Sequence, residues 1–376
     1  MQLKSVLGSS KFQRFKQTLR NNLSPEEKLL SLIHPSASVE HLEFSGDLLN
    51  EDTLYQLSVR HRLIPDIFHL TTIHPDWFST EFIKKISSIN QRKIKQGFQQ
   101  TREMVLLLDR FRKNNLLAVP LKGAILGQML YQDLGKRFSS DIDIFLHAND
   151  IEKAEREIVR AGYRRVQPPG HFSGANELYA RYKKDFMYVH PEKKVNLEIH
   201  WQLSSNNLLI ENAHTFLENL NEINFAGHAV KVMKDEYQFF YLTIHGAMHQ
   251  FFRLFWLRDI AACTQKLSDK SHKEVIKITA ANKLELPFIS AVVAAHIFYG
   301  TPVPNPVMEM HWPNSLYTTL RIIFSRIHGN EEMLVSERVQ KLYYLTLFKS
   351  SLRYKIRCLS GIYFRHKLRK NHHLGK

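Results

Sequence analysis

Short stretches in the middle of the chain are either wholly apolar or alternate apolar with polar residues, which is the pattern of β-strands. Residues 116–121 are apolar and end at a Lys-Gly pair, and residues 141–146 alternate. Strong helix formers fill residues 124–131 between them. Residues 186–190 and 195–203 then read as two strands joined by a short loop. This order predicts a small mixed sheet with a helix inserted between its first two strands.

On both sides of this core, apolar residues recur with a period near 3.6, which predicts amphipathic helices. Before the core, the predicted helices cover residues 51–62, 65–72, 79–90 and 91–115, after a helix start at Ser24. We therefore expect an α+β fold in three parts. A helical N-terminal subdomain covers residues 1–115, the αβ core covers 116–204, and a helical C-terminal subdomain with a basic tail covers 205–376.

Two carboxylates mark the strand at 141–146. Residues two apart on a strand share one face, so Asp141 and Asp143 project together while Ile142 and Ile144 face a core. Like charges on one face favour binding of a divalent cation, most simply Mg²⁺, which prefers oxygen ligands and leaves coordination positions for phosphates. The alternative is an ordinary solvated strand edge.

A third acid lies on the strand at 195–203, where Glu198 and His200 share one face and Leu197 and Ile199 the other. A carboxylate among apolar neighbours is costly unless it has a partner. If this strand pairs with the strand at 141–146, Glu198 completes a three-carboxylate site of the kind that two-metal phosphoryl transfer requires. The upstream Lys-Gly turn supports this interpretation, because a glycine before a helix lets backbone N–H groups approach a phosphate.

These motifs resemble the bacterial uncharacterised nucleotidyltransferase family of the DNA polymerase beta-like nucleotidyltransferase superfamily. The resemblance rests on Leu-Lys-Gly at 121–123, Arg137, Asp-Ile-Asp at 141–143 and Glu-Ile-His-Trp at 198–201. It covers residues 110–260 most clearly. The chain has Gly-Ala where the superfamily usually has Gly-Ser or Gly-Gly in the turn, and Glu where the family often has Asp as third acid.

The resemblance implies a metal-dependent enzyme that moves a nucleoside monophosphate from an NTP to an acceptor and releases pyrophosphate. Asp141, Asp143 and Glu198 would be the catalytic acids and would hold Mg²⁺ (or Mn²⁺). The residues expected to contact the nucleotide triphosphate are Lys122, Gly123, Arg137 and Ser140. His200 would contact the acceptor or the nucleotide. The acceptor itself is left open between a small molecule, a sugar, a protein side chain and tRNA.

A second group of polar residues lies beyond the core. His245, His249, Arg253, Trp256 and Asp259 have helical spacing and are predicted to form one polar stripe on an otherwise apolar helix. The resembled family has a similar His, His, Arg-Leu, Trp, Asp pattern here, which makes the two histidines and the arginine candidate acceptor or nucleotide contacts. The alternative is a buried Arg–Asp ion pair beside core histidines. Zinc binding is less favoured, because the glutamate of a His-Glu-x-x-His motif is absent.

Charge is distributed unevenly along the chain. The formal net charge is +16, and no acidic residue follows Glu337, whereas eleven Lys and Arg do. The rest of the chain is therefore only moderately basic, so nucleic-acid binding is not implied. The tail predicts at most weak peripheral contact with an anionic membrane surface or an acidic partner. Two alternatives stay open: a non-catalytic binding module that keeps the nucleotidyltransferase fold, and a basic adaptor for nucleic acid or membranes.

Composition also bears on the compartment. The apolar content of 44% is that of a globular chain. The two cysteines, Cys263 and Cys358, form neither a metal motif nor a disulfide framework, as is typical of a reducing cytoplasm. The N-terminus lacks the apolar run of a secretory signal, and no uninterrupted apolar segment is long enough to span a membrane. We therefore expect a cytoplasmic protein.

Overall fold

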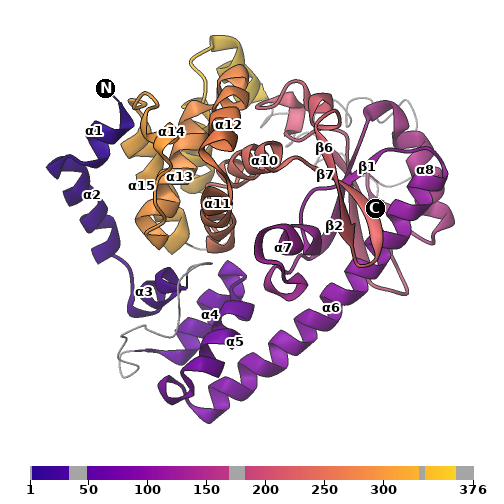
Figure 1. The fold of residues 1–376 in the computed structure, drawn as a ribbon, viewed down its shortest axis with the longest axis horizontal. Coiled ribbons are helices and arrows are strands. Elements are labelled where there is room, and N and C mark those ends of the chain that lie inside the picture. Colours follow the sequence, from indigo (N-terminus) through magenta and orange to yellow (C-terminus); the bar gives the residue numbers. More distant parts are fainter. Residues whose placement is uncertain (1, 34–48, 169–182, 330–334, 361–376) are drawn as a thin grey trace. The chain divides into compact units, whose positions relative to one another are not determined.

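The computed structural model describes residues 2–33, 49–168, 183–329 and 335–360. The chain divides into two compact units (Figure 1). The first unit comprises Met1–Ile94 and Phe239–Phe348, and the second comprises Lys95–Gln238 and Lys349–Lys376. Residues from both predicted helical flanks thus contribute to the first unit, and the predicted core lies within the second.

The first unit is built of helices. Their bounds are α1 (Leu3–Leu7), α2 (Ser10–Asn21), α3 (Pro25–Leu32), α4 (Glu51–His61), α5 (Ile64–Ile73), α11 (Leu254–Lys266), α12 (Asp269–Asn282), α13 (Glu285–Tyr299), α14 (Asn305–Met308), α15 (Leu316–His328) and α16 (Val335–Thr346). The unit also contains the beginning of α6 (Thr80–Lys113) and most of α10 (Asp235–Met248). Residues 79–90 and 91–115, predicted as two helices, form the single helix α6.

Two helices show how the sequence determines this unit. Ser24 begins α3 as predicted, because its hydroxyl accepts a hydrogen bond from the Glu27 N–H while the Glu27 carboxylate accepts one from the Ser24 N–H. Helix α13 is apolar on all sides, and it packs between α11 and α15. A helix without a polar face is stable only when it is surrounded by protein, so α13 forms the centre of this unit.

The second unit contains the predicted mixed sheet. Its strands are β1 (Ala118–Pro120), β2 (Asp141–Leu146), β3 (Arg164–Gln167), β4 (Asp185–His190) and β5 (Val195–His200), in the spatial order β1-β2-β5-β4-β3. The β2–β5 pair is parallel and the other three pairs are antiparallel. Helices α7 (Ala124–Tyr131) and α8 (Ile151–Arg160) connect the strands. The predicted α+β class is confirmed.

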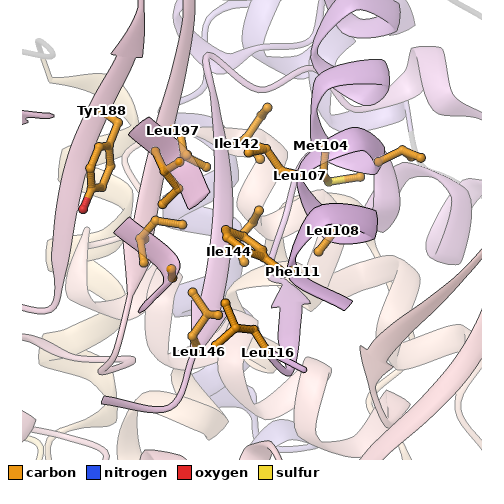
Figure 2. Packing of buried hydrophobic residues seen from close by; sticks show 14 of the residues in the cluster. Met104, Leu107, Leu108, Phe111, Leu116, Ile142, Ile144, Leu146, Tyr188 and Leu197 are labelled. Carbon is orange, nitrogen blue, oxygen red and sulfur yellow. The ribbon is translucent and has the colours of Figure 1, made fainter. Parts of the chain in front are cut away.

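One face of this sheet is the hydrophobic core of the unit. Ile142 and Ile144 of β2 and Leu197 of β5 belong to a buried cluster together with residues of α6. Figure 2 shows side chains of α6, among them Leu107 and Phe111, beside these strand residues. Because side chains alternate along a strand, burying these apolar residues turns the intervening carboxylates to the opposite face.

A hairpin corrects the prediction of a purely helical chain after residue 204. Strands β6 (Leu220–Phe225) and β7 (His228–Met233) pair antiparallel, and β7 lies against β1. Ala226 and Gly227 both have positive φ angles, 50° and 84°, as a tight two-residue hairpin turn requires. Along β7 the buried Val230 and Val232 alternate with the exposed Lys231, so the sequence carries a short strand signal here. Among the described residues, no helix is both long enough and apolar enough to cross a membrane.

Candidate functional site

The acidic residues meet where β2 and β5 pair. These strands run parallel, and their register places Asp143 directly beside Glu198 and Asp141 beside Asn196. The N–H of Leu121 donates a 3.0 Å hydrogen bond to the carbonyl of Asp143, which fixes the end of β1 against this site. The pairing on which the predicted carboxylate site depended is therefore present. The atoms of Asp143, Glu198 and His200 that can bind a metal lie within 4.8 Å of one another.

Asp143 is the most deeply buried member of the group, with a side chain that is 0% exposed. Its Oδ1 atom lies 3.0 Å from Lys122 Nζ and 3.0 Å from His200 Nε2. Its Oδ2 atom is buried and has no hydrogen-bond partner among the residues that the structure describes. Burial acts to raise the pKa of Asp143, but the charge of Lys122 and the His200 contact outweigh it, so the pKa lies far below its usual range. The carboxyl group is ionised at any ordinary pH.

His200 lies between the carboxylates. Its Nε2 atom is 3.3 Å from Glu198 Oε2 as well as 3.0 Å from Asp143. On the other side of the ring, Nδ1 lies 3.3 Å from Lys184 Nζ and 3.7 Å from Asp185 Oδ2. Burial and Lys184 act to lower the pKa of His200, but the contacts with the three carboxylates prevail, and the pKa is raised. The role predicted for His200 from the sequence was a contact with the acceptor or the nucleotide.

Lys122 faces these acids with a positive charge. Its side chain is 13% exposed. Burial acts to lower the pKa of Lys122, but the charges of Asp143, Asp141 and Glu198 outweigh this effect and raise it, so the ammonium group stays charged. Gly123 follows with φ +76° and ψ −145° and forms the N-cap of α7. A side chain strains this backbone conformation, which explains the glycine.

Asp141 has different partners. Its Oδ1 atom accepts hydrogen bonds of 2.8 Å from the Ser139 hydroxyl and 3.3 Å from the Ser140 hydroxyl. Asp141 does not belong to the group formed by Asp143, Glu198 and His200. Instead it lines a small cavity with Lys122, Gly123, Ser139 and the buried Arg137. The cavity thus gathers the turn and the arginine that were predicted to hold a triphosphate, together with Ser139, which was not predicted.

A glycine determines how Arg137 approaches this cavity. The loop that carries Arg137 passes so close to α7 that a Cβ atom on Gly127 would lie 2.9 Å from the carbonyl oxygen of Asp133. Real Cβ atoms essentially never come that close to backbone oxygen, so a larger residue at 127 would displace the loop. Gly127 therefore positions Arg137 indirectly.

The three remaining candidates, His245, His249 and Arg253, belong to the first unit. The prediction that they lie on one continuous helix is wrong. Helix α10 ends at Met248 and α11 begins at Leu254, and the chain between them turns through Phe251, which has a φ angle of +49°. The ring of Phe251 packs directly on Gly246, where a Cβ atom would lie 2.2 Å from a ring carbon. This contact, together with the hydrogen bond from the Phe251 N–H to the Gly246 carbonyl at 2.9 Å, ends the helix.

These residues nevertheless gather around Trp256. The ring of His249 stacks on Trp256 with centroids 5.1 Å apart, and His245 meets the indole edge-on at 5.7 Å. The guanidinium of Arg253 lies 6.0 Å from the Trp256 ring centre. A buried ion pair joins Arg258 of α11 to Asp66 of α5. The cluster belongs to the first unit, whereas the carboxylates belong to the second.

The carboxylate group of the second unit suits a divalent cation. Asp143 and Glu198 supply oxygen ligands side by side, and the buried Oδ2 atom of Asp143 has no partner among the described residues. An ionised oxygen in such a place is costly unless a cation or donor satisfies it. The parallel strand pair, its acids and the lysine-glycine turn thus form one candidate site on the sheet of an α+β protein.

Comparison with known families agrees with this class. The chain belongs to the uncharacterised nucleotidyltransferase family, whose model matches residues 47–300. The resemblance predicted from the motifs is thereby confirmed. The matched range includes both the carboxylate site and the cluster around Trp256. Family membership supports a general role as a nucleotidyltransferase.

Among solved structures, the chain is similar to an antigenic nucleotidyltransferase-like protein from Paracoccidioides brasiliensis. The two share 14% sequence identity, and the match covers 50% of this chain and 92% of that chain with a TM-score of 0.31. No curated protein matches the chain.

Proposed function

We propose that the protein is a divalent-cation-dependent nucleotidyltransferase that transfers a nucleoside monophosphate from an NTP to an acceptor hydroxyl group and releases pyrophosphate. The observation that carries this proposal is the buried, ionised Asp143 beside Glu198, with one carboxylate oxygen that lacks a partner among the described residues. Family membership supports the same reaction class.

Asp143 and Glu198, with Asp141 nearby on β2, are the residues that would hold Mg²⁺ (or Mn²⁺). When bound, the cation offsets the negative charge that develops on the reacting phosphate and on the leaving pyrophosphate. The donor set fits this task, because hard carboxylate oxygens are the ligands that Mg²⁺ prefers.

The remaining residues bind and orient the substrates in this proposal. Lys122, Arg137, Ser140 and the backbone at Gly123 contact the triphosphate, and the positive charges stabilise the leaving group. Lys122 now contacts Asp143 at 3.0 Å, so it exchanges this carboxylate for a phosphate when the substrate complex forms. The acceptor oxygen attacks the α-phosphorus, the bond from that phosphorus to the bridging oxygen breaks, and the acceptor proton passes to Glu198.

The test distinguishes transfer of the nucleoside monophosphate from transfer of the γ-phosphate. The full-length protein is incubated with a cell lysate, Mg²⁺ or Mn²⁺, and each NTP labelled either at the α-phosphate or at the γ-phosphate. We expect one lysate fraction to acquire the α-label and not the γ-label. The variant Asp143→Asn should lose the transfer, whereas Glu222→Gln, which alters an exposed ion pair on the β6–β7 hairpin, should keep it. Transfer of the γ-label would indicate a kinase, and the absence of both labels from every fraction would favour a non-catalytic binding module.

We propose a second role, attachment to anionic membrane surfaces, for the described part of the basic tail. Residues 352–360 form a helix that buries Tyr354 and Cys358 but exposes the three apolar side chains of Leu352, Ile356 and Leu359. These three lie at i, i+4 and i+7 and so form one face, which basic residues flank. Apolar contact and attraction to anionic lipid together give reversible membrane binding. The rest of the predicted tail, 361–376, lies outside the described residues.

This second role is tested with vesicles that contain phosphatidylserine. We expect the protein to cosediment with them at low salt, and to do so much less with neutral vesicles or at high salt. Replacing the exposed Leu352 and Ile356 by serine should weaken this binding while leaving nucleotide transfer unchanged. Equal sedimentation of the variant and the wild type would rule out the helix as the attachment surface.

A further inference from the structure

We propose that His200 is itself a metal ligand, so that the site formed by Asp143, Glu198 and His200 binds a first-row transition-metal dication in preference to Mg²⁺. This inference rests on the proposed function, since it names the cation at the same site. It differs from the three-carboxylate arrangement predicted from the sequence, because a nitrogen atom replaces the oxygen of Asp141 in the group.

The first support is the direction of the imidazole ring. His200 is 1% exposed, and its Nε2 atom lies 3.0 Å from Asp143 Oδ1 and 3.3 Å from Glu198 Oε2. The ring nitrogen and both carboxylates therefore converge on one region, with their ligand atoms within 4.8 Å of one another. The Oδ2 atom of Asp143, buried and without a partner among the described residues, is an independent sign that this region accepts a cation.

The second support is Asp185, which lies on the Nδ1 side of the His200 ring. The register of β4 and β5 places Asp185 beside His200, and Asp185 Oδ2 lies 3.7 Å from Nδ1. Metal-binding histidines usually donate their other N–H group to a carboxylate, which fixes the ring and leaves the lone pair of the first nitrogen toward the metal. Nδ1 also lies 3.3 Å from Lys184 Nζ, so the proposal requires this ammonium group to move aside and Nδ1–H to donate to Asp185 when the cation binds. Lys184 holds Asp185 in place at 2.8 Å.

The chemistry of the ligands then selects among the cations. Mg²⁺ is a hard ion that prefers oxygen ligands and retains its waters, so it gains little from an imidazole. First-row transition-metal dications bind imidazole nitrogen well, and their affinities rise from Mn²⁺ toward Co²⁺ and beyond. Two carboxylates and one imidazole therefore favour such an ion over Mg²⁺.

A direct test detects the nitrogen. Full-length protein is loaded with Mn²⁺ alone, and its electron spin-echo envelope modulation is recorded. We expect modulation from a coordinated imidazole ¹⁴N nucleus that changes when the histidines carry ¹⁵N, an observation that needs no variant. The modulation should disappear in His200→Gln and persist in His228→Gln, which alters a histidine paired with Asp109. Absence of imidazole modulation in the wild type, or its persistence in a folded His200→Gln protein, would overturn the assignment.

A competition experiment measures selectivity. The concentration of Mg²⁺ that displaces half of the bound Mn²⁺ should be at least about tenfold lower for His200→Gln than for the wild type, because loss of a ligand or of its support typically weakens metal affinity 10–100-fold. Asp185→Asn, which keeps the three proposed metal ligands, should also lower this Mg²⁺ concentration. Unchanged competition in both variants would contradict the proposal. Nitrogen coordination without nucleotide transfer would refute the proposed function alone, and transfer without nitrogen coordination would refute this inference alone.

Discussion

Lys122→Met gives the sharpest test of how the carboxylate site is held together. Methionine is close to lysine in length but carries no charge, so the substitution removes the ammonium group 3.0 Å from Asp143 with little change in volume. In protein treated with a chelator, the buried carboxylate of Asp143 would lose its main counter-charge. We expect the variant to fold but to be substantially less stable than the wild type.

The magnitude follows from the geometry. At a separation of 3.0 Å and an effective dielectric constant near 20, the attraction is roughly 5 kcal/mol. Removing one partner of a buried ion pair typically costs about 3–5 kcal/mol. Because His200 also contacts Asp143 at 3.0 Å and partly replaces the lost charge, we expect the lower end, about 3 kcal/mol. For a unit of this size, that loss lowers the melting temperature by roughly 6–12 °C.

The assay is urea and thermal unfolding of Lys122→Met, Asp143→Asn and the double variant after chelation. If the two side chains form an ion pair, the double variant loses much less stability than the sum of the single variants, with a coupling energy above about 1 kcal/mol. Added Mn²⁺ should stabilise Lys122→Met more than the wild type, because the cation no longer competes with the lysine. Additive losses in the cycle, or a Lys122→Met protein as stable as the wild type, would refute the proposed pairing.

Three further predictions concern other parts of the molecule. In protein treated with a chelator, Glu198→Gln should unfold at the same or a higher temperature, because the cluster loses one of its like charges. The same variant should transfer nucleotide more slowly by orders of magnitude. A lower melting temperature with normal transfer per folded molecule would show that Glu198 has a structural role. Gly127→Ala should weaken nucleotide binding, measured by calorimetry, because the new Cβ atom would lie 2.9 Å from the Asp133 carbonyl oxygen and displace the loop that carries Arg137. The control Gly8→Ala, where the nearest atom is 3.6 Å away, should leave nucleotide binding unchanged. Burial, and secondarily the charge of Arg60, holds the pKa of His61 well below its ordinary value, so the free energy of unfolding should fall as the pH drops below about 6.5, at up to roughly 1.4 kcal/mol per pH unit. His61→Asn, which keeps an acceptor for the Leu254 N–H, should unfold with a shallower pH dependence, and an identical slope would exclude His61 as the cause.

Local periodicity was enough to predict much of the second unit. The alternation along 141–146 and 195–203 predicted two strands with carboxylates on one face, and the structure has β2 and β5 paired with Asp143 beside Glu198. Helix starts were equally readable, because a capping box involves residues only three apart in sequence. Such features depend on neighbours in the chain, and a pattern of apolar positions records them directly.

The break between α10 and α11 could not be read in this way. The stretch from His249 to Arg253 contains neither proline nor glycine, and its spacing fits an unbroken helix. What ends the helix is the ring of Phe251 packing on Gly246, with the left-handed backbone at Phe251 held by its complete burial. A glycine within an apolar helix has several explanations, so its use as a packing surface for a later ring becomes visible only in three dimensions.

The importance of His200 was hidden for a related reason. The sequence placed it on the same face as Glu198, but its other partners, Asp143 and Asp185, come from the two strands on either side of β5. The antiparallel register with β4 brings Asp185 behind the ring, while the parallel pairing with β2 brings Asp143 in front of it. The spacing of acids along the two strands indicated only which carboxylates could share a metal. The buried Asp143 is compensated by Lys122 and His200, whose contacts with it are visible only in the structure. In the proposed substrate complex, a cation binds the same acids and Lys122 contacts a phosphate in place of Asp143. The residues that compensate the buried acids in the free protein are therefore also those whose contacts change when the nucleotide binds.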